Sequence, residues 1–185
     1  MSLKYAILTS LTERVGGGIE LARRFDRSIG YFWPATHQQI YRELDRLVTA
    51  GLIRELPLEG PPGRGNPKRF EVTAAGAAAL GEWIGEVDEA DPMRSTLAVR
   101  VRAAAATGRV DEVRRALEHH RRGRLADLER YRAIEERDFA AVDPGDTRAV
   151  LQHRVLELGI RVEQTWLDWC DETLAALGGQ AAPEA

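Results

Sequence analysis

Residues 28–51, SIGYFWPATHQQIYRELDRLVTAG, decide the fold of the N-terminal half of the chain. Thr36 and Gln39 have the spacing of a capping box, in which the Thr36 hydroxyl accepts from the amide of Gln39 and the Gln39 side chain accepts from the amide of Thr36. A helix is therefore predicted to begin directly after Thr36. Gly51 can adopt the left-handed conformation that ends helices, so this helix is predicted to stop there.

The predicted helix has an apolar and a polar face. Apolar residues at i, i+4, i+7 and i+8 have the period of an amphipathic helix, and they are Ile40, Leu44, Leu47 and Val48. The opposite face carries His37, Gln38, Tyr41, Arg42, Asp45 and Thr49. The first four of these can contact base edges and phosphates. This profile is typical of a DNA recognition helix, although an ordinary amphipathic surface helix is the alternative when the helix is considered alone.

Two shorter helices are predicted before this one. The first lies near residues 3–11, and three glycines at 16–18 break its pattern. The second covers residues 19–27, with Ile19, Ala22 and Phe25 as its expected apolar side chains. A loop at 28–34 with Tyr31, Phe32 and Trp33 then leads to the capped helix.

A basic β-hairpin is predicted after the capped helix. Residues 52–56 and 68–73 have the composition and alternation of two paired strands. The loop between them is rich in glycine and proline, and no acidic residue occurs from Gly60 to Phe70. Its basic residues are Arg64, Lys68 and Arg69. Three helices followed by such a hairpin predict a winged helix-turn-helix domain with the hairpin as wing.

A boundary between two domains is predicted near residue 88. A fourth helix begins at Thr73, and the acidic segment 86–92 that follows it contains Asp91-Pro92, which disfavours continued helix. We therefore expect a winged helix-turn-helix DNA-binding domain at 1–88, a helical dimerisation and effector domain at 89–180, and a disordered tail at 181–185. The fold class is mainly α, with three to four helices plus the wing in the first domain.

The second half contains only helical patterns. Helices are predicted at about 93–106 and 111–141, the latter with Val113, Leu117, Leu125, Leu128 and Ile134 as a sparse apolar stripe among many charged residues. The last helix has a heptad-like seam, which is typical of helix association. Its leading residues are Leu151, Val155, Leu158, Val162, Trp166 and Trp169. A second apolar row beside the seam makes the helix apolar over more than half its circumference, so we expect a homodimer that forms through this seam.

Composition excludes several classes of protein. With 44% hydrophobic residues the chain can bury a real core, but it has no apolar run of about 18 residues. Its first eleven residues lack the pattern of a signal peptide, so we expect none. One cysteine, Cys170, excludes an intrachain disulfide. No catalytic motif, phosphate loop or metal-ligand spacing occurs, so we expect no enzyme activity, no metal and no cofactor. The expected protein is soluble and cytoplasmic, without membrane association.

The net charge of −3 hides an uneven distribution of charge. Residues 1–85 carry 11 Lys and Arg against 9 Asp and Glu, whereas the remaining residues carry 15 against 20. The positive balance therefore accompanies the capped helix, as nucleic-acid binding requires, but it is weaker than in many DNA-binding domains.

Several stretches of the sequence resemble the PadR transcriptional regulators, within the branch that includes virulence-gene activators. They are LKYAILTSL (3–11), SIGYFWPATHQQIYRELDRLVTAGLI (28–53), GNPKRFEVTAAG (65–76) and LELGIRVEQTWLDW (156–169). The third is similar to the family's wing, with Phe70 where the family usually has tyrosine, and the fourth is similar to its C-terminal dimerisation helix. The resemblance implies a dimeric DNA-binding regulator with a winged N-terminal domain and a helical C-terminal domain.

We interpret the chain as a homodimeric regulator of transcription, a ligand-responsive repressor that binds an operator in double-stranded DNA. Gln38, with His37 and Arg42, is assigned to base edges. Thr36, Gln39, Tyr41 and Arg46 are placed near the DNA backbone, and Arg64, Lys68 and Arg69 on phosphates or in the adjacent minor groove.

Three alternatives remain open at this level. Trp166 and Trp169 either fill the dimer core, which is preferred, or stack on a small aromatic effector. The winged domain could instead be a protein–protein interaction module without direct DNA binding. A small-molecule sensor without a DNA role is disfavoured, because it leaves the capped helix and the basic hairpin without a purpose.

Overall fold

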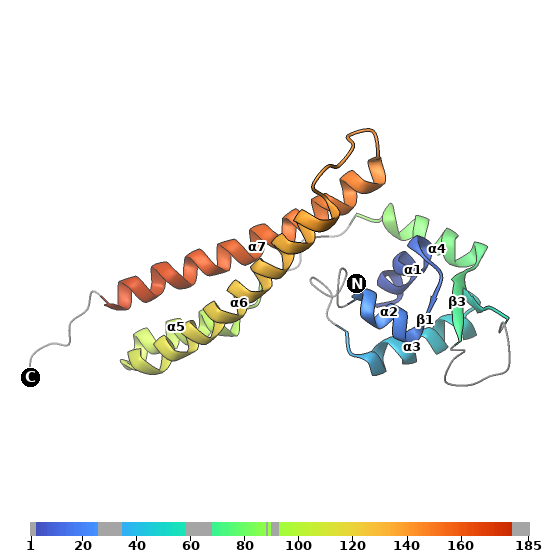
Figure 1. Ribbon diagram of the computed structural model, residues 1–185. Coiled ribbons are helices and arrows are strands. Elements are labelled where there is room, and N and C mark those ends of the chain that lie inside the picture. The colour runs from blue at the N-terminus through green and yellow to red at the C-terminus, as the bar shows by residue number, and fades with distance from the viewer. Residues whose placement is uncertain (1–2, 26–34, 58–67, 88, 90–92, 179–185) are drawn as a thin grey trace, which may run out of the picture. The chain divides into compact units, whose positions relative to one another are not determined.

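The computed structural model describes residues 3–25, 35–57, 68–87, 89 and 93–178, which form two compact units, Met1–Ala90 and Asp91–Ala185 (Figure 1). Arg64, the loops at 28–34 and 59–67 and the predicted tail at 181–185 lie outside the described residues. None of the described helices is both long and apolar enough to cross a membrane.

The first unit contains helices around a small sheet, in the order that the sequence predicted. Three helices precede a β-hairpin and a fourth helix follows it (Figure 1). The elements are α1 (Leu3–Glu13), β1 (Gly16–Gly17), α2 (Gly18–Phe25), α3 (His37–Thr49), β2 (Ile53–Glu55), β3 (Arg69–Val72) and α4 (Ala74–Ile84).

The capping box at the start of α3 is confirmed. The Thr36 amide donates to Gln39 Oε1 at 2.8 Å, and the Gln39 amide donates to Thr36 Oγ1 at 3.2 Å. At the other end, Gly51 adopts a φ of +69° just beyond the helix. The start and end of α3 therefore follow from local hydrogen bonding and backbone conformation, as the sequence predicted.

Two predictions of buried side chains were wrong. Val48 of α3 is exposed, because eight residues along a helix place it about 80° from Ile40, at the edge of the apolar face. Ile19 of α2 is also exposed, and Leu21 is buried in its place. Leu21, Ala22 and Phe25 occupy one side of the helix, and Ile19 lies almost opposite Leu21.

The sheet has three strands, whereas the sequence predicted a two-stranded hairpin. The strand order is β1-β3-β2, and both pairings are antiparallel. Gly16 pairs with Phe70 and Gly17 with Arg69, so the glycines that were predicted only to break α1 also form a strand. Two glycines carry no side-chain alternation, and for that reason the sequence pattern did not reveal this strand.

The core of the first unit joins all four helices to the sheet. It is built from aliphatic and aromatic side chains that are almost completely buried. Its largest members include Ile7 and Leu8 from α1, Phe25 from α2, Leu44 from α3 and Ile53 from β2. This core sets the orientation of α3, since its inner face is packed against α1 and α2 while its outer face stays in solvent.

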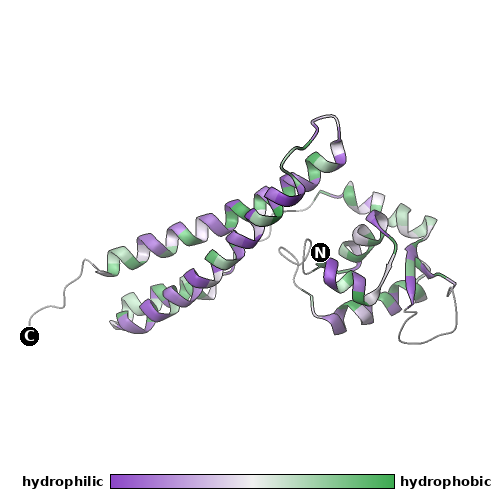
Figure 2. Ribbon diagram, in the orientation of Figure 1, coloured by the Kyte–Doolittle hydropathy of each residue, from purple (hydrophilic) through white to green (hydrophobic). Residues whose placement is uncertain are grey.

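The second unit consists of α5 (Thr96–Thr107), α6 (Val110–Asp138) and α7 (Thr147–Gly178). Helices α6 and α7 run side by side along most of their length, with α5 beside the first part of α6 (Figure 1). Hydrophobic and hydrophilic positions alternate along both long helices (Figure 2). This alternation is what two helices need when each buries one face and hydrates the other.

The apolar stripe of α6 differs from the prediction at two positions. Val113, Leu117 and Leu128 are buried, but Leu125 is exposed. Tyr131, which the sequence did not single out, is buried instead, and its ring packs directly on Gly159 of α7, where an added Cβ would lie 3.2 Å from Tyr131 Cε2. A tyrosine carries enough apolar area to serve as a core residue.

Polar contacts also join α6 to α7. Arg124 Nη1 donates to both carboxylate oxygens of Glu163 at 3.1 Å, and Glu163 is only 6% exposed. Arg121 pairs with Asp171, and Arg132 donates to the Gln164 side chain at 3.1 Å. Because the exposed pairs contribute little to stability, the buried Glu163 with its cation is the polar contact most sensitive to substitution.

Gly76→Ala is expected to destabilise the first unit by roughly 1–3 kcal/mol. An added Cβ would lie 2.0 Å from the backbone oxygen of Leu52, which already accepts hydrogen bonds from the amide and the hydroxyl of Thr73. Urea unfolding of the full chain measures the change in the free energy of unfolding.

Gly81→Ala on the same helix is the matched control for Gly76→Ala. Nothing lies within 4 Å of its added Cβ, so better helix propensity should stabilise this variant by roughly 0.5–1 kcal/mol. Similar effects of the two substitutions would contradict the close approach of α4 to Leu52.

Candidate nucleic-acid interface

The outer face of α3 presents three polar side chains that have no polar partner among the described residues. His37, Gln38 and Arg42 are exposed, and within the described residues they form no hydrogen bond or ion pair. All three come from the first turn and a half of the helix. Their donors and acceptors are therefore available to a ligand without loss of an internal partner.

Other predicted contact residues on α3 already have internal partners. The Thr36 hydroxyl and the Gln39 side-chain oxygen form the cap, and they also hydrogen-bond to each other at 3.1 Å. Arg46 pairs with Glu43 at 3.2 Å. The side chains of α3 and its cap thus divide into those that hydrogen-bond or ion-pair within the helix and those whose polar atoms can contact a ligand.

Tyr41 connects α3 to the start of α2. Its ring lies over Gly18, where an added Cβ would come within 2.3 Å of Tyr41 Cε1. The side chain nevertheless remains exposed. Only glycine permits this approach of the two helices at Gly18, and it leaves the Tyr41 hydroxyl at the surface.

The described part of the hairpin carries paired and unpaired cations. Lys68 Nζ lies 2.8 Å from Glu55 Oε2, and this hydrogen bond, with help from the charges of Glu55 and Asp45, raises the pKa of Lys68 above its ordinary value. Arg54 pairs with Glu71 across the sheet. Arg69 makes no ion pair with any described residue, which leaves its charge available to a phosphate.

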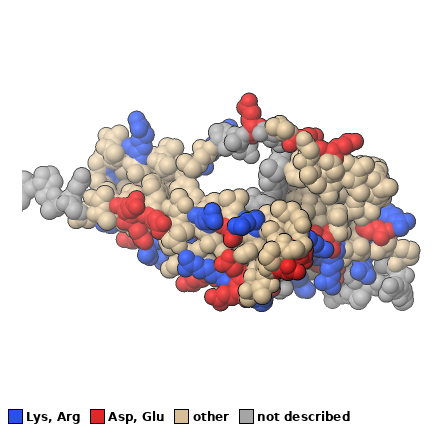
Figure 3. All heavy atoms as spheres, turned by 90° about the horizontal axis from the view of Figure 1, so that it is seen from above, with Lys and Arg blue, Asp and Glu red and all other residues tan. Residues whose placement is uncertain are grey.

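Charges of both signs are mixed on the surface. Lys and Arg alternate with Asp and Glu over the face that Figure 3 displays. The outer residues of α3 also carry both signs of charge, since Asp45 lies exposed between Arg42 and Arg46. A single broad positive patch therefore does not distinguish this helix. Individual side chains, chiefly on α3 and at the start of β3, have to supply the specific contacts.

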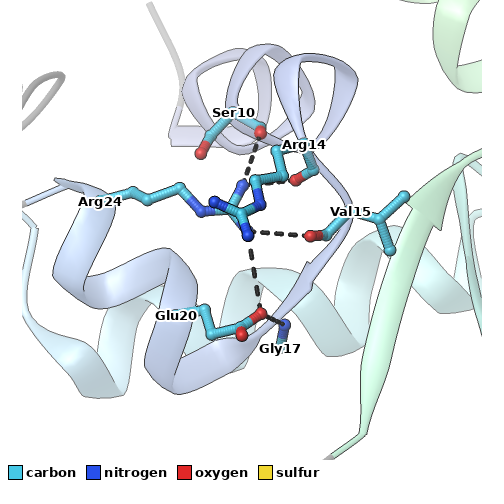
Figure 4. Close-up of polar contacts among 6 residues, drawn as sticks. All are labelled: Ser10, Arg14, Val15, Gly17, Glu20 and Arg24. Atoms are coloured by element: carbon cyan, nitrogen blue, oxygen red, sulfur yellow. Dashed lines mark hydrogen bonds and ion pairs between the residues drawn. The ribbon is translucent and has the colours of Figure 1, made fainter.

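Arg24 secures the end of α1 beside this surface. Its guanidinium donates to the backbone oxygens of Ser10 and Val15, each at 3.0 Å, and to that of Arg14 (Figure 4). The last carbonyls of a helix lack intrahelical partners, and a guanidinium can satisfy several of them at once. Burial lowers the pKa of Arg24 below its ordinary value, but an arginine stays protonated.

Glu20 extends this contact to the sheet. Its carboxylate lies 3.9 Å from Arg24 and accepts from the Gly17 amide at 3.1 Å (Figure 4). Gly17 is paired with Arg69 in β3, and a Cβ on Gly16 would come within 2.0 Å of Arg24 Nη2. Arg24 and Glu20 thereby hold the sequence 16–18 between the first helix and the wing strand.

Sequence reasoning missed this junction. The available signals were the i, i+4 spacing of Glu20 and Arg24 and the run of three glycines directly before them. The contacts of these residues form only where α1, β1 and α2 pack together, and the spacing along the sequence does not show that packing. Hence the glycines were interpreted as a simple helix break.

The residues of the predicted dimer seam on α7 separate into two groups. Four aliphatic side chains are exposed, and the two leucines among them, Leu151 and Leu158, have exposed fractions of 61% and 62%. The other two aliphatic residues are Val155 and Val162. Large aliphatic side chains in one exposed row are typical of a surface that associates with a partner.

Trp166 and Trp169 differ from these four because they are half-buried. Their rings make an edge-to-face contact, with centroids 5.6 Å apart and an interplanar angle of 86°. Trp169 also packs against the buried cluster of α5, α6 and α7, which includes Leu117 and Cys170. Trp169 is therefore partly a residue of the single chain's own core.

Comparison with known proteins identifies the family. The probable transcriptional regulator Rv1176c of Mycobacterium tuberculosis is 40% identical over 96% of this chain and 98% of its own length. The virulence activator AphA of Vibrio cholerae is 31% identical, with a TM-score of 0.78 over 97% of this chain and 100% of that one. Residues 93–178 match the family model described as virulence activator alpha C-term. The chain is a PadR-like transcriptional regulator.

The PadR fold extends over nearly the whole chain. The negative transcriptional regulator PadR of Bacillus subtilis is 34% identical over 83 residues, 44% of each chain. Its structure in complex with operator DNA has a TM-score of 0.80 and 23% identity, and covers 94% of this chain and 97% of that one. The same protein has also been solved with p-coumaric acid. The predicted family and the winged helix-turn-helix fold class are confirmed, and these relatives are regulators rather than enzymes.

Arg24→Ala is expected to lower the free energy of unfolding by roughly 1–3 kcal/mol, because three backbone oxygens at the end of α1 lose a charged donor. Arg24→Lys should recover only part of this loss, since an ammonium cannot reproduce the planar fork of a guanidinium. Urea unfolding of the variants measures both effects.

Arg23→Ala, at the exposed neighbouring position of α2, is the matched control for Arg24→Ala and should change stability by less than about 0.5 kcal/mol. A similar loss in the Arg23 and Arg24 variants would show that the contacts of Arg24 do not secure α1.

Proposed function

We propose that this PadR-like regulator binds operator DNA as a homodimer, with α3 in the major groove and the β2–β3 hairpin as wing, and that it acts in the cytoplasm as a ligand-responsive repressor. The observation that carries the proposal is the outer face of α3, where a capped helix presents His37, Gln38 and Arg42 without a polar partner in the part of the chain that the structure describes. Such exposed side chains can replace their hydrogen bonds to water with hydrogen bonds to base edges at little cost in free energy.

The internal contacts suggest how the DNA-binding residues divide their work. Gln38, His37 and Arg42 are the proposed readers of base edges. Thr36 and Gln39 act through the cap, which aims the amino end of α3 towards the DNA, and Tyr41 and Arg46 lie near the DNA backbone. The wing residues Arg64, Lys68 and Arg69 would contact phosphates, with Arg69 ahead of Lys68 because Glu55 already holds the lysine.

Dimerisation is proposed through the exposed row of α7. Leu151, Val155, Leu158 and Val162 leave a continuous apolar surface on the side of α7 that does not face α6. A second copy of the same helix is the partner that a heptad-like row fits. Two winged domains can then contact half-sites one or more helical turns apart, which a single domain cannot span.

Repression and an effector are proposed by analogy with a relative. The Bacillus subtilis protein is named a negative transcriptional regulator, and its p-coumaric acid complex shows that an aromatic acid binds to that protein. In this chain Trp166 and Trp169 offer half-buried indole rings beside the proposed dimer surface. An aromatic effector that stacks there would reach the dimer contact directly.

Gln38→Ala should weaken binding to the specific operator by roughly 1–3 kcal/mol and leave binding to random DNA almost unchanged, because a contact with a base edge carries sequence information. Fluorescence anisotropy at a fixed salt concentration measures both affinities. Thr49→Ala, at the opposite end of α3, is the control and should alter neither.

Equal losses on the two DNAs would remove Gln38 from base reading. A wild-type chain that binds neither DNA at low salt would favour the alternative of a protein–protein interaction module, which the mixed surface charge would also suit.

Leu158→Glu is expected to raise the dissociation constant of the dimer at least about 100-fold. Each copy loses roughly 1.5–3 kcal/mol of apolar burial, and the interface gains a buried charge. Sedimentation then detects monomer, and a gel shift should show loss of binding to the full operator. The monomer itself should stay folded, because Leu158 is exposed in the single chain.

Leu125→Glu is the matched control for Leu158→Glu, since Leu125 is an exposed leucine on α6 outside the row. It should remain dimeric. A Leu158→Glu variant that stays dimeric at micromolar concentration would show that α7 associates through another surface or not at all.

A further inference from the structure

Three side chains of metal-binding type meet near the turn between α6 and α7. They are Glu135 of α6 and His153 and Glu157 of α7. Each offers one ligand atom, and the three atoms lie within 4.8 Å of one another. All three residues are half-buried, so they are neither fully solvated surface charges nor part of the dry core.

The positions of these residues follow from helix geometry. His153 and Glu157 are four residues apart, which places them on the same face of α7, one turn from each other. Glu135 lies across from them on α6, with its Oε1 2.8 Å from His153 Nε2. Two ligands at i, i+4 and a third from the neighbouring helix is an arrangement that can enclose an ion.

Neighbouring residues orient the two ligands on α7. The Phe139 ring stacks on the His153 imidazole, with centroids 5.1 Å apart and an interplanar angle of 11°. This contact holds Nε2 towards Glu135. Arg154 donates to Glu157 Oε2 at 2.6 Å, which lowers the pKa of Glu157 and fixes the direction of its carboxylate.

We propose that Glu135, His153 and Glu157 bind one divalent transition-metal ion of the Zn²⁺ class. An imidazole nitrogen with two carboxylates is a donor set that zinc accepts, whereas calcium and magnesium prefer oxygen alone. The two carboxylates supply the negative charge that attracts the cation, and Arg154 and Arg161 are the neighbouring cations of Glu157 with which the ion competes.

The dimensions of the cluster suit this ion. Bonds of about 2.1 Å in a tetrahedral site place the ligand atoms about 3.4 Å apart. Glu135 Oε1 and His153 Nε2 are 2.8 Å apart, and all three ligand atoms lie within 4.8 Å of one another, a range that includes the separation in a tetrahedral site. Three protein ligands leave the fourth position to water, as in an open zinc site.

The ion would link α6 to α7 without blocking the proposed dimer surface. His153 lies on the face of α7 towards α6, nearly opposite the exposed row of Leu151, Val155 and Leu158. Glu157 lies at the side of the helix, about 100° from Leu158. Bound metal would therefore stiffen the hairpin of the two long helices. Metal binding at this site does not depend on DNA binding, and titration with metal ions measures it separately.

The test is titration of the full, tag-free chain with Zn²⁺ by calorimetry, after treatment with EDTA, and with Co²⁺ by visible absorption. One ion per chain is expected, together with a rise of several degrees in the melting temperature. Glu157→Gln and His153→Gln should each weaken binding at least about tenfold, since even outer-shell substitutions cost metal sites about 10–100-fold. Both variants should also lose the Co²⁺ spectrum of the wild type.

The double variant His119→Ala, His120→Ala is the control, because these adjacent histidines of α6 are the other candidates for metal capture in the second unit. It should bind Zn²⁺ like the wild type. Unchanged affinity in Glu157→Gln and His153→Gln, or loss of binding in the control, would overturn the proposal. If His153→Gln does not fold, Glu157→Gln decides alone, because it leaves the contact of His153 with Glu135 in place.

Discussion

The close approach of backbone and side chains at Gly16–Gly18 is the constraint on which the DNA-facing half of the molecule depends. A Cβ at Gly16 would collide with Arg24, and one at Gly18 would collide with Tyr41 of α3. Between them, Gly17 pairs with Arg69 of the wing strand. Three consecutive residues therefore lie between the end of α1, the wing strand and α3, and a side chain at the first or third of them would displace Arg24 or Tyr41 from its present position.

Arg24 and Glu20 explain why so small a strand can persist. Two residues of sheet contribute few backbone hydrogen bonds, but the guanidinium adds charge-assisted bonds to Ser10, Arg14 and Val15, and Glu20 binds the Gly17 amide. Charge-assisted bonds are roughly twice as strong as neutral ones. The position of α3 itself rests on its cap and its buried face rather than on the proposed readers, which have no polar partner among the described residues.

Helix α7 of the second unit carries three different sets of contact residues. One face packs against α6 through residues such as Leu156 and Leu167, and Gly159 admits the ring of Tyr131 there. The opposite face carries the exposed aliphatic row that we propose as the dimer surface. Near the turn, His153 and Glu157 of this helix also lie close to Glu135 of α6. The proposed dimer surface would account for the excess of apolar residues on this helix, because a second face would then be buried.

What the sequence by itself determined were the features that rest on local chemistry. The Thr36–Gln39 cap, the end of α3 at Gly51, the order of helices and hairpin, and the exposed row of α7 all depend on residues close together in the chain. The quoted motifs also identified the family, which the comparisons confirmed. The roles of individual residues in DNA binding and dimerisation stay predictions.

The tertiary structure decided the features that depend on residues far apart in the chain. Strand β1 exists because β3 lies beside two glycines that carry no pattern of their own. Tyr131 is buried because Gly159 of α7 makes room for it, and Glu135 meets His153 across 18 positions of sequence. Spacing along one helix fixes which side chains share a face, but only the packing of two elements fixes which faces meet.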